Sequence, residues 1–423
     1  MYAQIDWRTV SFLIKRNALK TKANFQHLYI PMKEISIFRL FLIFLKIGMT
    51  AFGGNIALVA ALQKELCAKR KILNDEQVLD FTTIGNILPG PLATNVVAAC
   101  GFALRGMPGL VVGLIGVILP ALILICVLTE LYFQYGTAPV LLKVFNGLLP
   151  GVAAIITATA WSLAKKNLKY PMQIFIVVAA GLAIILLKGF LVTLLLITIS
   201  GFMGFIFLKN KLATQHIQIQ ATPLFLKSPF RAIICLLIIG CFIYFFHPAS
   251  LLLQELRMLA LTFGGMSVTL FGGGYVFIPA IEKIVVGLQH WLSAKEFADG
   301  IALGQVTPGP VAITASFVGY RVAGVLGAIV SATAIFIPPA LLMVFTQQFV
   351  DRIKRRPSIE AIFMGVRPAV IGMILASVWV IGKSAPLQWQ SLLIFGLVLG
   401  LLLWKKIDSG LLIVLAGTLG YFL

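Results

Sequence analysis

The chain has 423 residues, of which 60% are hydrophobic and 11% are charged, and its mean hydropathy is +1.01. A soluble domain carries about 25% charged residues, so this composition excludes an ordinary soluble domain and predicts an all-α polytopic membrane protein. The formal net charge is +20, from 34 Lys and Arg against 14 Asp and Glu, and the basic residues cluster in loops. Such clusters are typical of cytoplasmic loops, with attraction of an anionic solute as the alternative, and no nucleic acid is expected as a partner.

The predicted elements begin after a basic cytoplasmic segment at 1–35. Two apolar segments interrupted by Gly and Pro follow at 37–68 and 77–104. The uninterrupted spans predicted before the middle of the chain are 109–133, 144–164, 171–187 and 190–208. A span at 231–246 has no partner upstream, and the spans predicted after it are 324–350, 358–382, 389–404 and 409–423. These stretches do not alternate apolar and polar residues, so they predict helices rather than the strands of a β-barrel.

Two short motifs recur at a constant offset. The FGG motif at 52–54 returns at 271–273, and the PGP motif at 89–91 returns at 308–310, with an offset of 271 − 52 = 219 in both cases. Beyond the second motif the offset is 218, as for Gly106 and Gly324 (324 − 106 = 218). This duplication predicts two repeats of one fold, at 36–208 and 255–423, joined by a linker at 209–254 that contains the extra span.

One extra span between two repeats inverts the second repeat, and the basic loops agree with that topology. With the N-terminus inside, the loops that contain Lys165, Lys209, Arg352 and Lys405 fall inside, and the C-terminus falls outside. The path of the interrupted segments stays open: each FGG and PGP segment either crosses the membrane once or forms a re-entrant hairpin with the break at its tip. The basic loop at 64–71 lies inside only if the segments are hairpins, so the charges favour hairpins.

The PGP break is expected to bind an anion. Freed backbone groups find no water in a bilayer, so a broken helix is tolerated where it lines a cavity. Pro91 suits the first position of a new helix, whose positive end binds an oxyanion without a fixed cation. Two inverted breaks would enclose a tetrahedral dianion, with further donors from Asn86, Thr94, Asn95, Gln305, Thr307 and Thr314. The alternative is that Gly and Pro merely allow close packing and kinks.

Three charged residues are candidates for charge or proton coupling. Lys46 would either neutralise an anion or extend to the membrane interface. Asp80 and Asp299 correspond at the offset of 219 (299 − 80 = 219) and are candidate proton carriers, with helix-terminal charges near the interface as the alternative. The sequence contains no GxxxxGK[ST] loop, no HExxH motif and no paired Cys and His ligands, so neither an ATP-driven pump nor an enzyme is expected.

The stretches "TAFGGNIALVAALQKEL", "GNILPGPLATN", "LFGGGYVFIPAIEK" and "ALGQVTPGPVAITASFVGY" resemble the paired signatures of the chromate ion transporter family in its long-chain, two-domain form. The resemblance covers nearly the whole chain beyond residue 36. It implies a multi-pass protein of the bacterial inner membrane that exports chromate with the proton gradient. Asn55, Asn86 and Asn95 stand where the family has Pro, Gln and Gln, and Ile72 stands where it has Trp. An anion channel, or a permease for sulfate or another organic anion, is the alternative.

The break chemistry and the resemblance together imply a substrate site at both pairs of motifs. Its expected residues are Gly53, Gly54, Asn55, Asn86, Pro89, Gly90, Pro91, Thr94, Asn95, Gly272, Gly273, Gln305, Thr307, Pro308, Gly309, Pro310 and Thr314. The expected partners are chromate or a related oxyanion, protons and the lipid bilayer, and a homodimer is left open. No catalytic residue, metal or cofactor is expected.

Overall fold

The computed structural model describes residues 35–423 except 53, 87, 137, 188–189, 213–233, 235–237, 242, 246–247, 270–273, 348–356, 387 and 406. Nearly all of the segment predicted at 1–35 and half of the span predicted at 231–246 lie outside the described residues. Regular structure in the described residues is entirely helical, which confirms the all-α class.

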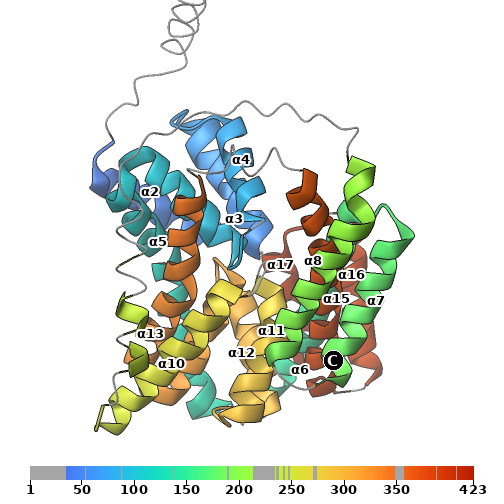
Figure 1. The fold of residues 1–423 in the computed structure, drawn as a ribbon. Coiled ribbons are helices and arrows are strands. Elements are labelled where there is room, and N and C mark those ends of the chain that lie inside the picture. Colours follow the sequence, from blue (N-terminus) through green and yellow to red (C-terminus); the bar gives the residue numbers. More distant parts are fainter. Residues whose placement is uncertain are drawn as a thin grey trace, which may run out of the picture. The chain divides into compact units, whose positions relative to one another are not determined.

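The helices of the two halves follow the order that the sequence predicts (Figure 1). Those before residue 213 are α2 (Ile37–Thr50), α3 (Gly54–Leu62), η1 (Gln63–Lys69), α4 (Asp75–Gly85), α5 (Leu92–Tyr135), α6 (Pro139–Asn167), α7 (Pro171–Leu186) and α8 (Phe190–Leu212). Those after residue 250 are α10 (Leu251–Thr269), η2 (Gly274–Val276), α11 (Phe277–Glu282), η3 (Lys283–Leu288), α12 (Ala294–Val306), η4 (Val311–Ile313), α13 (Thr314–Gln347), α15 (Pro357–Ser384), α16 (Trp389–Lys405) and α17 (Ser409–Phe422).

Several of these helices are suited to a bilayer. Among the described residues, five helical segments are long and apolar enough to cross a membrane: Leu92–Tyr135, Pro139–Asn167, Leu251–Thr269, Val311–Gln347 and Glu360–Ser384. Shorter apolar helices run at Pro171–Leu186, Val192–Leu208, Trp389–Trp404 and Ser409–Phe422. Large apolar side chains are exposed on the outer surface of these helices, which is the pattern of a multi-pass membrane protein.

The long helices α5 and α13 each contain a reversal of the chain. The φ and ψ angles are −146°, 23° at Arg105 and 62°, −148° at Gly106. They are −140°, 31° at Ala323 and 60°, −149° at Gly324. A glycine tolerates a positive φ because it has no Cβ to clash. The same reversal therefore occurs in both halves, at the offset of 218 that the sequence predicts.

Paired glycines hold the two arms of each reversal together. A Cβ on Gly101 would overlap the carbonyl oxygen of Gly109, and a Cβ on Gly319 would overlap that of Gly327. The chain therefore turns sharply at each contact, because residues eight positions apart meet. Each long helix is thus a short arm, such as 92–104, followed by a longer arm that is able to cross the membrane.

Each PGP break is the tip of a helical hairpin. Gly85 lies against Asn95 in the first half, and Gly304 lies against Thr314 in the second half. Residues at equal distances from the break therefore touch, so α4 and α12 run back along the short arms that follow them. α4 has 11 residues, and at about 1.5 Å per residue it rises roughly half the thickness of a bilayer core.

The two halves are interleaved. α15 packs on α7 and α8 of the first half, while its counterpart α6 packs on α16 and α17 of the second half. Figure 1 shows α8, α15 and α7 side by side. The closest contacts pair small residues: a Cβ on Gly147 would overlap the backbone of α17, and a Cβ on Gly365 would overlap the backbone of α8. Small residues let helices approach closely within a membrane, where apolar surface alone gives no selectivity.

Candidate functional site

The FGG break of the first half meets the PGP break of the second half. The Gly309 N–H donates a hydrogen bond of 2.8 Å to the carbonyl oxygen of Ala51, which precedes the FGG motif. Gly54, the last residue of that motif, begins α3 with a φ of 72°, and a Cβ on it would lie 3.1 Å from Cγ2 of Val311. A carbonyl freed by one break thus accepts from an amide freed by the other, which satisfies both backbone groups without water.

Two buried side chains lie beside this contact. The Tyr275 hydroxyl, from η2, is 3.4 Å from Oε1 of Gln305 near the end of α12, and a Cβ on Gly54 would lie 3.7 Å from the same hydroxyl. Tyr275 and Gln305 are each 6% exposed. The Gln305 Nε2 has no hydrogen-bond partner among the described groups. Ala51, Gly54, Tyr275, Gln305 and Gly309 are called the central junction below.

The long helices α6 and α15 both reach Tyr275. The Thr159 hydroxyl of α6 donates a hydrogen bond of 2.9 Å to the carbonyl oxygen of Ile155 and lies close enough to the phenol oxygen to affect it. The Ser377 hydroxyl of α15 donates a hydrogen bond of 2.9 Å to the Tyr275 backbone carbonyl. Thr159 and Ser377 occupy matching repeat positions (377 − 159 = 218), so equivalent hydroxyls from the two halves hold one residue of the central junction.

The PGP break of the first half packs against the second half. Gly90 has a φ of 94°, and a Cβ on it would overlap the ring of Pro339. The Asn95 Nδ2 donates a hydrogen bond of 3.0 Å to the carbonyl oxygen of Pro89, and the Asn95 Oδ1 is buried without a partner among the described groups. An unpaired oxygen acceptor repels an oxyanion, so the central junction, with its unpaired donor, is the better anion site.

Most described residues of the predicted site are buried, and one is exposed. Those buried at the breaks are Gly54, Pro89, Gly90, Pro91, Thr94, Asn95, Gln305, Thr307, Pro308, Gly309, Pro310 and Thr314. Asn86 is instead exposed, and its Nδ2 donates a hydrogen bond of 2.8 Å to the Thr82 carbonyl of its own helix. Asn55 lies in the first turn of α3, and Gly53, Gly272 and Gly273 lie outside the described residues. The matched amides Asn86 and Gln305 thus have different surroundings.

Lys46 pairs with a carboxylate rather than lying at the central junction. Its Nζ is 3.2 Å from Oε1 of Glu65, which also accepts from Lys69 Nζ at 2.9 Å and lies near Arg70, 3.8 Å from Nε to Oε2. Glu65, in η1, lies outside the candidate spans. Its hydrogen bond from Lys69, with help from Lys46, lowers the pKa of the Glu65 carboxyl below its usual value.

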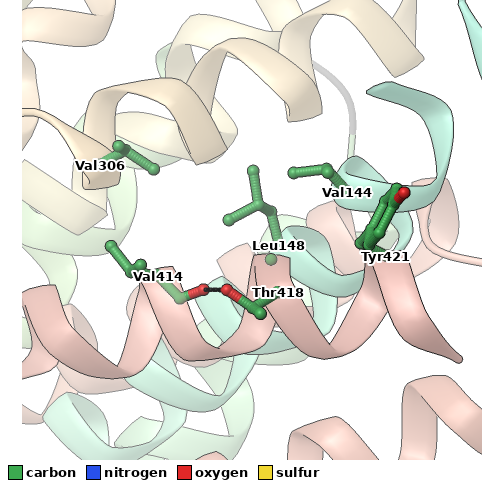
Figure 2. Close-up of a pocket in the computed structure, with 7 residues that line it drawn as sticks. Val144, Leu148, Val306, Val414, Thr418 and Tyr421 are labelled. Atoms are coloured by element: carbon green, nitrogen blue, oxygen red, sulfur yellow. Dashed lines mark hydrogen bonds between the residues drawn. The ribbon is translucent and has the colours of Figure 1, made fainter. Parts of the chain in front are cut away.

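A pocket of about 390 Å³ opens beside Val306, which follows Gln305. Figure 2 shows its lining, which comes from α6, α12 and α17. The lining residues are Val144, Leu148, Val306, Val414, Gly417, Thr418 and Tyr421. The Thr418 hydroxyl already donates to the Val414 carbonyl at 2.8 Å. Such an apolar lining offers few donors to an oxyanion, so this pocket is not the candidate anion site.

Sequence patterns alone did not identify three residues of this site. Thr159 and Ser377 could have been found from the repeat, because both are hydroxyl residues at matching positions, two residues before the paired Trp161 and Trp379. Tyr275 could not have been found in this way, because the matching residue of the first half is Ile56 (275 − 219 = 56).

Comparisons with known proteins agree with this architecture. The family model for the chromate transporter matches residues 38–205 and again residues 257–421. An uncharacterized transporter of Methanocaldococcus jannaschii is 29% identical over 394 residues, which cover 92% of this chain and 94% of that protein. A probable chromate transport protein of Synechococcus elongatus is 30% identical over 391 residues, 89% of this chain and 93% of that protein. A chromate transport protein of Cupriavidus metallidurans is 26% identical over 385 residues, 90% and 92% of the two chains.

No solved structure matches the chain significantly. The two family matches together span the helices that carry both sets of breaks, and the relatives align along nearly their whole length. This multi-pass membrane protein belongs to the chromate transporter family.

Proposed function

We propose that the protein exports chromate or a related oxyanion across the bacterial inner membrane, as a secondary transporter driven by the proton gradient. The observation that carries the proposal is the unpaired Nε2 of Gln305, buried beside the start of α3 where two breaks meet. An unpartnered buried donor costs about 1–3 kcal/mol, and an anion oxygen bound there recovers that cost. The chromate transport proteins among the relatives support chromate as the substrate.

The donors proposed for the anion are neutral. α3 begins at Gly54, so its first N–H groups have no partner within the helix and present the positive end of the helix dipole. The Gln305 amide and the Tyr275 hydroxyl lie beside that end. The Gly309 N–H already donates to Ala51, so Gly309 fixes the break rather than binding the anion. Lys46 forms an ion pair with Glu65, so its charge is already partly neutralised and it is not counted among the donors.

The proposed mechanism uses the two halves as inverted repeats. Their matching reversals and hairpin tips, and the two separate family matches, support the repeats at 36–208 and 255–423. The hairpin shape of α4 and the arm 92–104 supports the re-entrant path. A site between two such hairpins is exposed to each side in turn when one set of helices rocks against the other.

Purified protein in liposomes tests this function. Labelled chromate should accumulate against its own gradient when a pH gradient is imposed, and the accumulation should collapse when a protonophore removes that gradient. The chain should also exchange internal for external chromate without any pH gradient. A channel would equilibrate chromate without accumulation, and absence of both accumulation and exchange would contradict chromate transport altogether.

A further inference from the structure

Asp299 is a buried carboxyl in the middle of α12. It is 1% exposed, and its Oδ2 accepts a hydrogen bond of 2.7 Å from the Tyr132 hydroxyl, near the end of α5. Its Oδ1 is buried and has no hydrogen-bond partner among the described groups. A buried carboxylate in this position loses its hydration and gains only one hydrogen bond in return. A neutral carboxylic acid loses less hydration on burial, so the site favours the protonated form.

Aromatic rings surround the contact between Asp299 and Tyr132. The Tyr132 ring packs edge-on against Phe133, Phe145 and Phe317, with centroid distances of 5.1, 5.3 and 5.8 Å. Phe317 lies so close to Gly300 that a Cβ on that glycine would overlap the ring. These rings replace water around the carboxyl and strengthen every electrostatic interaction there.

Few other titratable groups approach this carboxyl. α12 packs on α5, α6, α13, α15, α17, η3 and η4, and among their described residues Tyr132 is the titratable side chain that reaches Asp299. The nearest charges are Lys295 and Glu296, of opposite sign, in the first turn of α12 itself. Glu130, two residues before Tyr132 on α5, accepts instead from the Tyr320 hydroxyl of α13, at 2.9 Å.

The equivalent carboxyl of the first half has different surroundings. Asp80 is only partly buried. The residue that matches Tyr132 in the repeat is Val350 (132 + 218 = 350), which has no hydroxyl to donate. Phe317 is matched by alanine, because both offsets (317 − 219 = 98 and 317 − 218 = 99) fall on Ala98 or Ala99. The phenol of Tyr132 and the ring of Phe317 therefore have no aromatic counterpart at the matching repeat positions, whereas Phe145 is matched by Phe363 (145 + 218 = 363).

We infer that Asp299, positioned by Tyr132, is the proton-carrying group of the transport cycle, and that Asp80 does not share this role. The inference rests on the proposed proton-driven transport. A proton from water bonds to Oδ1 and converts the carboxylate into a neutral acid, while Tyr132 keeps its own proton, and release reverses the step. Asp299 and Gln305 lie six residues apart on α12, about 9 Å along the helix, so proton and anion act on one rigid element.

Two variants at matched repeat positions test the inference in proteoliposomes. Asp299→Asn imitates the neutral acid and cannot release a proton. It should reduce chromate accumulation under a pH gradient to the level seen without a gradient, while chromate exchange continues. Asp80→Asn is the control and should keep both activities. Normal accumulation by Asp299→Asn, or an equal loss in Asp80→Asn, would overturn the inference.

A third variant leaves the carboxyl in place. Tyr132→Phe keeps the ring packing but removes the donor that stabilises the carboxylate, so the pH midpoint of accumulation should rise by about one unit. An unchanged midpoint would contradict the positioning role of Tyr132 even if Asp299→Asn could not be obtained as folded protein. If the unmodified protein neither accumulates nor exchanges chromate, the proposed function itself fails. If the unmodified protein is active and Asp299→Asn accumulates chromate equally well, only the inference about Asp299 fails.

Discussion

Asn86 and Gln305 occupy one repeat position but have different environments. The Asn86 amide is exposed and bonds to its own helix, whereas the Gln305 amide is buried with an unpaired nitrogen. The two side chains differ in length by one carbon and lie on helices with different neighbours. Asn86 therefore bonds to the end of its own helix, whereas Gln305 has a buried donor without a partner among the described groups. Matched positions in a duplicated sequence therefore identify candidates, and burial decides between them.

Gln305→Ala should weaken chromate binding more than Asn86→Ala. A hydrogen bond to a charged ligand contributes about 1.5–3 kcal/mol, so the dissociation constant should rise roughly 10- to 150-fold for Gln305→Ala. Asn86→Ala removes only an exposed helix-end contact and should leave binding near that of the unmodified protein. Equilibrium binding of chromate to purified, folded variants measures both, and equal effects would place the anion outside the central junction.

Lys46 gives a second residue-scale test, because its ion pair with Glu65 distinguishes a site built on a fixed cation from one built on hydrogen-bond donors. With Lys46 held by Glu65, Lys46→Ala should lower chromate affinity far less than Gln305→Ala. Complete loss of binding in Lys46→Ala, with normal binding in Gln305→Ala, would show that a fixed cation holds the anion.

The Glu65 cluster also predicts a pH dependence of stability. Because Lys69 and Lys46 lower the pKa of Glu65 in the folded protein, its stabilising effect is present above the usual value of 4.5 and is lost as the pH falls through the lower folded value. Each half-exposed pair contributes about 0.2–1 kcal/mol. Glu65→Gln should therefore lower the melting temperature in detergent at pH 7, and this difference should vanish in acid. A difference that grows on acidification would contradict the assignment.

At the scale of elements, the breaks were predictable from the sequence, whereas the reversals and the contacts between helices were not. Gly and Pro interrupt a helix locally, so the offset of 219 located the breaks at Gly90 and Gly309. The sequence matched Gly106 with Gly324 at the offset of 218 but did not predict that the chain reverses there. The hydrogen bond from the Tyr132 hydroxyl to Asp299 joins residues that are 167 positions apart in the sequence. No local pattern specifies such a contact, because it depends on how α5 and α12 pack.

Gly101→Ala should destabilise the first reversal. Its Cβ would overlap the Gly109 carbonyl oxygen, and forcing the arms apart costs about 1–3 kcal/mol. Gly396→Ala on α16 is the matched control, because no atom lies within 4 Å of the added Cβ, and alanine favours a helix by about 0.5–1 kcal/mol. Thermal unfolding in detergent should show a lower melting temperature for the first variant and no decrease for the second. A lower melting temperature in both would mean that contact distance is not the cause.

For the whole molecule, inversion of the halves predicts that Lys209 and Leu423 lie on opposite sides of the membrane. Single cysteines at these positions, in a chain whose five native cysteines have been replaced, should react with an impermeant reagent from opposite faces. Position 209 should be labelled from the cytoplasmic face and position 423 from the outer face, as the basic loops indicate. Labelling of both from one face would contradict the inverted arrangement.

The interleaved packing of the halves has a consequence for biosynthesis. α6 is complete at residue 167, but its partner α17 ends at residue 422, so 422 − 167 = 255 residues must still be translated. At about 5–20 residues per second, α6 waits roughly 13 to 50 seconds in the bilayer before that partner exists. Throughout this interval the small-residue surface of α6 at Gly147 and Gly151, which α17 later covers, is open to lipid or to the insertion machinery. A ribosome that stalls between the halves therefore leaves a membrane-embedded fragment with unmatched small-residue surfaces, which is the kind of substrate that membrane proteases and insertion chaperones recognise.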